Sequence, residues 1–257
     1  MTSFTLRSFS RFLSSTSATP VNSQCGCGFD RVGWRTEPFG ALKPCDSHIV
    51  ALTSAPASSW SSTVHMAPGA MMQLHDELAK LASKRTVKVS VAKAESALQL
   101  TRAGRPAFVV ASRTAPPVLL SDDSETLARD AARVAVGEPT RSPTLAVESV
   151  ADRVLLFVCA HSAVDARCGT CGPQLLSALE ASRVRSSSPL YLHAISHLGG
   201  HAFAPNVLVF HRSRALWLAY VALEQADSLV SWLSASDDPL ANVPREFRTL
   251  VRGTHLA

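Results

Sequence analysis

The chain has 257 residues, enough for one large domain or two smaller ones, and its 46% apolar content is sufficient to build a hydrophobic core. Its net charge of +5 comes from basic residues scattered without a Lys/Arg stripe or interleaved aromatic residues, so nothing favours nucleic-acid binding. No apolar run approaches the roughly 18–20 residues of a membrane-spanning helix, which argues against membrane insertion.

Residues 1–24 differ in composition from the rest of the chain. They are rich in Ser and Thr and contain Arg7 and Arg11. They contain no acidic residue, and the first acid of the chain is Asp30. Their apolar residues can cluster on one face of a short helix, a pattern typical of an organellar transit peptide. We therefore predict a mitochondrial protein. The alternatives are a plastid protein, or a cytosolic protein with an ordinary Ser-rich N-terminus.

Strand and helix patterns mix over residues 25–137, which predicts an N-terminal α/β domain. We expect strands over residues 47–53, 86–91, 107–111 and 118–120 and helices over residues 69–84 and 125–136. The first helix is indicated by Met71, Leu74, Leu78 and Leu81 at helical spacing. The turn-forming stretch GEPTRSPT then predicts a linker, placed at residues 138–149.

Residues 150–257 form the second predicted domain. A continuous apolar strand over 153–158 is followed by a loop over 159–172 and by a helix that starts at Pro173 and ends at Ser182. A strand over 190–195, a hairpin of strands 207–210 and 215–221, and a helix over 222–234 complete the domain. Strand, helix, strand, hairpin and helix is the order of a thioredoxin-like fold.

Two motifs at strand ends carry residues that bind metals. Cys159 and Cys168 form a C-x8-C motif, and His197 and His201 form an H-x3-H motif. Two thiolates and two imidazoles are a complete ligand set for a [2Fe–2S] cluster, in which histidines can replace two of the usual cysteines. Zinc is the alternative, although structural zinc sites favour C-x2–4-C spacing, and a gap of eight residues suits a larger, two-metal group better.

A third interpretation uses a different pair of cysteines. Cys168 and Cys171 form a C-x-x-C motif between a predicted strand and a predicted helix, where a thioredoxin-like fold carries a dithiol active site. The helix N-terminus would stabilise a thiolate there. Because Cys168 cannot serve both as a metal ligand and as half of a redox dithiol, the two interpretations exclude each other.

Both motifs also resemble a known family. The segments FVCAHSAVDARCGTCGPQLL and ISHLGGHAFAPNVLVF are similar to the two signatures of the sucrase/ferredoxin-like family, which are C-x-H-x3-D-x-R-C-G and S-H-x-G-G-H-x-F-A-x-N-V. A weaker resemblance upstream includes Lys43, Pro44 and His48, and together the similar segments cover most of residues 38–225. The family's fungal members include proteins of actin-patch distribution and of altered mitochondrial inheritance.

The resemblance implies a thioredoxin-like ferredoxin domain whose [2Fe–2S] cluster is held by Cys159, Cys168, His197 and His201. Around it we expect Asp165 and Arg167 to pair and brace the loop. For His161 we expect either a hydrogen bond near the cluster or a solvent-facing position in the loop.

We therefore predict a protein that transfers electrons or senses redox state rather than converting a substrate, with a partner protein that the sequence does not identify. A thiol oxidoreductase using Cys168 and Cys171, or a non-catalytic subunit of a larger mitochondrial complex, is the alternative.

Overall fold

The computed structural model describes residues 42–43, 45–67, 69–82, 85–93, 106–123 and 125–255. The predicted transit peptide over residues 1–24, together with Cys25, Cys27 and Pro44, lies outside the described residues. Within the described part of the chain, no helix combines the length and the apolar content needed to cross a membrane.

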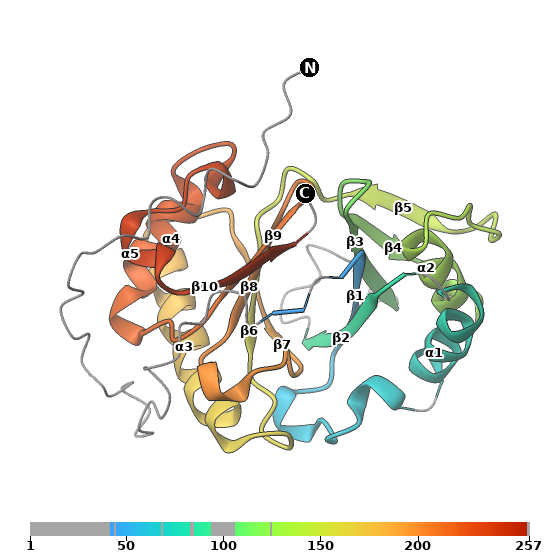
Figure 1. The fold of residues 1–257 in the computed structure, drawn as a ribbon, viewed down its shortest axis with the longest axis horizontal. Helices are drawn as coiled ribbons and strands as arrows, with labels where there is room; N and C mark the ends of the chain where they lie inside the picture. The colour runs from blue at the N-terminus through green and yellow to red at the C-terminus, as the bar shows by residue number, and fades with distance from the viewer. Residues whose placement is uncertain are drawn as a thin grey trace.

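Ten strands of the described residues form one sheet, in the order β10-β9-β8-β6-β7-β2-β1-β3-β4-β5 (Figure 1). The strands are β1 Ser47–Thr53, β2 Val87–Lys93, β3 Ala107–Ser112, β4 Val118–Ser121, β5 Ala146–Ser149, β6 Leu155–Cys159, β7 Tyr191–Ile195, β8 Val207–His211, β9 Arg214–Leu218 and β10 Val251–His255. The α-helices of the same residues are α1 Ala70–Leu81, α2 Leu127–Ala135, α3 Ala166–Arg185, α4 Ala226–Ser234 and α5 Arg245–Arg248. The predicted α/β class is confirmed.

The sheet has two halves that join between β2 and β7. Strands β1 to β5 belong to the N-terminal half and β6 to β10 to the C-terminal half. The antiparallel pairs Ala92–Ile195 and Lys93–Ala194 connect them. The predicted linker over 138–149 ends in the edge strand β5, and Asp130 of α2 accepts hydrogen bonds from the backbone N–H groups of Arg141 and Ser142. The linker is therefore held against the N-terminal half.

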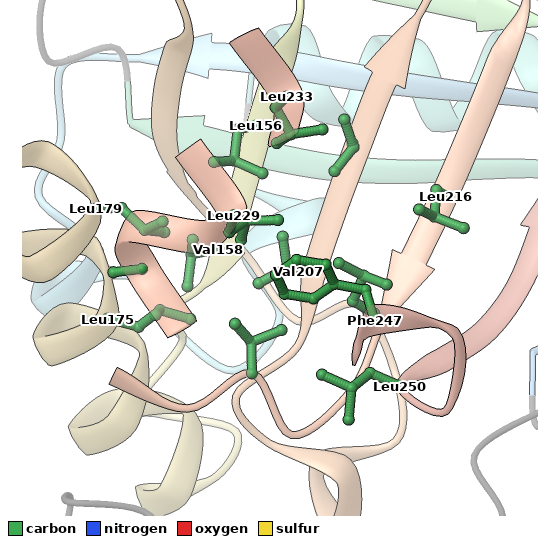
Figure 2. Close-up of a cluster of buried hydrophobic side chains, with 14 of the residues drawn as sticks. Leu156, Val158, Leu175, Leu179, Val207, Leu216, Leu229, Leu233, Phe247 and Leu250 are labelled. Atoms are coloured by element: carbon green, nitrogen blue, oxygen red, sulfur yellow. The ribbon is translucent and has the colours of Figure 1, made fainter. Parts of the chain in front are cut away.

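Helices cover one face of each half. In Figure 1, α3, α4 and α5 lie at the left of the strands and α1 and α2 at the right. Figure 2 shows how side chains of α3 and α4 meet the strands of the C-terminal half; the labelled residues include Leu175 and Leu179 of α3, Leu229 and Leu233 of α4, Leu156 and Val158 of β6 and Val207 of β8. These leucines and valines are almost completely buried, which makes this layer a main source of stability.

The opposite face of the sheet packs against itself. His48 of β1 stacks on Trp217 of β9, with ring centroids 6.0 Å apart, although four strands separate β1 from β9 in the sheet order. Phe210 of β8 contacts both rings edge-on. The sheet is therefore strongly curved, and residues of both halves share one buried cluster.

The start of α3 corrects the sequence-based prediction. The helix begins at Ala166 rather than at Pro173, so Cys168 and Cys171 lie in its first turns and not in a loop. The reason is the cap: the Asp165 carboxylate accepts the backbone N–H of Arg167 at 2.9 Å. Pro173 lies inside the helix, where it removes one backbone hydrogen bond without ending the helix. Strands β5 and β10 and the short helix α5 are additions that the sequence did not predict.

Candidate metal centre

Cys159 and Cys168 are brought together by close contact between a strand and a helix. Cys159 is the last residue of β6, and Cys168 lies in the first turn of α3; both are buried. The backbone of α3 approaches the end of β6 so closely that a Cβ atom at Gly172 would lie 2.0 Å from the Cys159 carbonyl oxygen. Glycine at position 172 is therefore required for the two sulfur atoms to meet.

His197 lies beside the two cysteines, just after the neighbouring strand β7. β6 and β7 are parallel, so the residues that follow them leave at the same edge of the sheet. Cys159, Cys168 and His197 each offer a ligand atom, and these atoms all lie within 4.8 Å of one another. This is a group that could hold a metal ion.

His201 lies at the rim of this group. Its ring centroid is 5.7 Å from that of His197, and its side chain is 48% exposed. Its Nδ1 atom is 3.9 Å from a carboxylate oxygen of Asp165. Three of the four predicted ligands thus converge, and the fourth lies beside them on the solvent side.

The two thiols differ in their affinity for a proton. The pKa of Cys159 is held well below its usual value, chiefly because the Cys168 side chain donates a hydrogen bond to its sulfur. Hydrogen bonds from the His197 side chain and from the backbone N–H groups of Leu198 and His161 lower this pKa further. The pKa of Cys168 is raised, first by the same hydrogen bond and then by burial. One thiolate is therefore stabilised before any metal binds, which is the form that a metal requires.

A further observation shows that these residues fit a metal ion or a cluster. The Nδ1 atom of His197 is buried and has no hydrogen-bond partner among the described residues. A buried nitrogen without a partner costs free energy unless a bound group satisfies it. Thiolate and imidazole are also the ligands that suit zinc and iron–sulfur clusters. Cys171 is not in the convergent group, and its sulfur is disulfide-bonded.

Comparison with known proteins places the chain in a family. Residues 38–249, most of the chain, match the sucrase/ferredoxin-like family. The chain belongs to the sucrase/ferredoxin-like family. No solved structure matches it significantly.

Three relatives illustrate how far the similarity extends. "Altered inheritance of mitochondria protein 32" of Clavispora lusitaniae is 33% identical over 89 residues, which is 34% of this chain and 33% of the relative. The protein of the same name from Candida glabrata is 44% identical over 57 residues, 21% of this chain and 17% of the relative. "Actin patches distal protein 1" of Saccharomyces cerevisiae is 28% identical over 111 residues, 38% of this chain and 35% of the relative. The matched stretches therefore cover about a third or less of these relatives.

The supporting residues predicted in the first family motif have defined contacts. Arg167 donates two hydrogen bonds of 2.9 Å to the Asp165 carboxylate, which lowers the pKa of Asp165 to about 2. His161 is buried. Its Nδ1 atom accepts the backbone N–H of His197 at 3.2 Å, and its Nε2 atom lies 2.8 Å from the Ser61 carbonyl oxygen, so Nε2 carries the proton. The Asp165–Arg167 pair and the buried His161 therefore have contacts beside the candidate ligands, and their supporting role stays a prediction.

Two further residues hold the loop of the second family motif. The Asn206 side-chain amide donates to the Gly200 carbonyl at 3.0 Å, and Arg252 of β10 donates to the Gly199 carbonyl at 2.9 Å. Asn206 belongs to the motif, but no motif includes Arg252. The sequence carried no signal for Arg252, because its contact depends on a C-terminal strand that periodicity did not predict.

Proposed function

We propose that this member of the family is a redox protein that holds a [2Fe–2S] cluster with Cys159, Cys168, His197 and His201. The observation that carries the proposal is the convergence of two buried cysteines and one histidine within 4.8 Å, with the second histidine beside them. A bound cluster of this kind supplies a centre that accepts and returns one electron. The chain's own residues supply the ligands, with the two cysteines buried and His201 at the solvent side.

Zinc is the competing occupant of the same ligands. Cys2His2 is a common zinc set, and the convergence of side chains does not depend on which metal binds. The wide C-x8-C spacing supports the cluster, because Cys168 reaches the site from a helix rather than from a tight chelating turn. Metal analysis separates the two.

The thiol oxidoreductase alternative has less support. A reactive thiol needs exposure and a lowered pKa, but Cys168 is fully buried and its pKa is raised. Cys168 is also a free thiol and is not bonded to Cys171. These observations favour a role for Cys168 as a ligand rather than as half of a catalytic dithiol.

We also propose a mitochondrial protein that exchanges electrons with a partner protein or works within a larger mitochondrial complex. The support is the composition of residues 1–24 together with the names of relatives such as "Altered inheritance of mitochondria protein 32". A plastid or cytosolic location is the alternative, and a subunit that keeps the fold without metal would also be compatible with these names.

Purification without added metal tests the proposed cluster. The expected result is a red-brown protein with about two iron and two acid-labile sulfide atoms per chain, as one [2Fe–2S] cluster requires. The reduced protein should give an electron paramagnetic resonance signal. A colourless protein with one zinc per chain would contradict the cluster and support the zinc alternative. A metal-free protein that takes up neither iron with sulfide nor zinc on reconstitution would refute both.

A further inference from the structure

Arg252 lies beneath the loop that carries both candidate histidine ligands. It comes from β10 at the edge of the sheet and is only 2% exposed. Its Nη1 atom donates to the Gly199 carbonyl at 2.9 Å and to the Asn206 side-chain oxygen at 2.7 Å. Because Asn206 in turn binds the Gly200 carbonyl, both central carbonyl groups of the loop are held through this arginine.

The loop is shaped to admit the guanidinium. Gly200 has a φ of +65°, and a Cβ atom there would lie 2.3 Å from Nη2 of Arg252. The guanidinium also stacks on Phe203, with its central carbon 5.0 Å from the ring centroid. Glycine at position 200 thus serves the arginine as well as the turn.

We propose that Arg252 is a positioning residue of the metal site. It holds the His197–His201 loop in place and puts a permanent positive charge next to that loop. The inference rests on the proposed function for its second part, since the charge matters only if a redox centre is bound there.

Two observations support a role directed at the site rather than at general packing. The Nε atom of Arg252 is buried and has no hydrogen-bond partner among the described residues, so this donor is not used in holding the loop. Burial lowers the pKa of Arg252, and attraction to Cys159, the cysteine whose thiolate is stabilised, opposes that change. A buried cation stabilises the more negative, reduced state of a nearby redox centre.

The test compares Arg252→Gln, which removes the charge, with Arg252→Lys, which keeps the charge but loses the forked geometry. Arg248→Gln is the matched control, because Arg248 lies in the exposed part of α5 and changes the net charge equally. Two quantities are measured on the full chain: hydrogen–deuterium exchange of residues 196–206, and the reduction potential of the metal-loaded protein. Circular dichroism shows whether each variant is folded.

In both Arg252 variants we expect the backbone amide hydrogens of residues 196–206 to exchange at least about tenfold faster than in the wild type. The loss of one hydrogen bond to a charged group implies a change of this size. The potential of Arg252→Gln should fall, that of Arg252→Lys should stay closer to the wild type, and Arg248→Gln should change neither quantity. Unchanged exchange would overturn the positioning role. Equal shifts of the reduction potential in Arg252→Gln and Arg248→Gln would overturn the proposed local effect of the Arg252 charge.

The two proposals fail in different ways. A wild-type protein without a cluster removes the proposed function, but the exchange measurement still decides whether Arg252 holds the loop. If Arg252→Gln does not fold, Arg252→Lys decides the positioning role by exchange. The charge role is then decided by Asn206→Asp, which sets a carboxylate against the guanidinium and should lower the potential; an unchanged potential would refute it.

Discussion

The backbone N–H of His197 donates a hydrogen bond to Nδ1 of His161, with 3.2 Å between the nitrogen atoms. The other ring nitrogen of His161 binds the Ser61 carbonyl in the N-terminal half, 100 residues away in sequence. One buried imidazole therefore connects a candidate ligand to a loop from the other half of the sheet. A change in either half can alter the position of His197 through this contact.

Replacing His161 should loosen the site. His161→Phe leaves the His197 N–H and the Ser61 carbonyl without partners, and each buried group left unpaired costs about 1–3 kcal/mol. His161→Asn keeps an acceptor near Nδ1, and His161→Gln keeps a donor near Nε2. We expect iron retention to follow the order wild type, Asn, Gln, Phe, measured by metal content after dialysis against a chelator. If the Phe variant retains iron as well as the wild type does, the contact has no role in metal binding.

The cysteines can be sorted into ligands and non-ligands. Cys159→Ser and Cys168→Ser should abolish iron binding, because serine does not replace a thiolate in this soft ligand set. Cys171→Ser should leave the iron content unchanged. Cys45→Ser is the matched control, since Cys45 is a buried free cysteine in the N-terminal half. Iron lost from Cys171→Ser but kept in Cys159→Ser would show that the ligand assignment is wrong.

The buried His48 should make stability depend on pH. Complete burial, with a smaller contribution from Lys88, lowers its pKa from 6.5 to about 3. Below pH 6.5 the unfolded chain binds a proton at this residue and the folded chain does not, so the free energy of unfolding falls as the pH decreases toward 3. The loss is about 1.4 kcal/mol per pH unit, or roughly 2 kcal/mol at pH 5.

Urea denaturation at pH 7 and pH 5 checks this expectation. His48→Gln removes the titrating group and keeps a hydrogen-bonding side chain near Ser90, whose hydroxyl lies 2.9 Å from the His48 ring. The variant should therefore lose less stability at pH 5 than the wild type does. His75→Gln, at an exposed position on α1, should behave as the wild type. An equal loss in the wild type and in His48→Gln would contradict the prediction.

The N-terminal segment should direct import into mitochondria. Its two arginines, its Ser and Thr residues and the absence of acids are the features on which such import depends. Fusing residues 1–30 to a fluorescent protein should give a mitochondrial signal, and replacing Arg7 and Arg11 with glutamate should abolish it. A diffuse cytosolic signal from the unmodified fusion would count against the prediction, and a plastid signal would select the other organelle.

The sequence by itself determined the elements whose signals are local. The apolar run of β6, the hairpin of β8 and β9 and the helical spacing in α1 are periodic patterns, and each element lies within a few residues of its predicted bounds. The paired motifs likewise indicated Cys159, Cys168, His197 and His201, because ligand spacing is a property of short segments.

Only the tertiary structure decided how these segments meet. The curvature of the sheet places His48 against Trp217, and β10 brings Arg252 beneath the His197–His201 loop. Arg252 lies 53 residues from Gly199, and His161 lies 100 residues from Ser61. Contacts over such separations depend on how a whole sheet twists and packs, and no local sequence pattern encodes that.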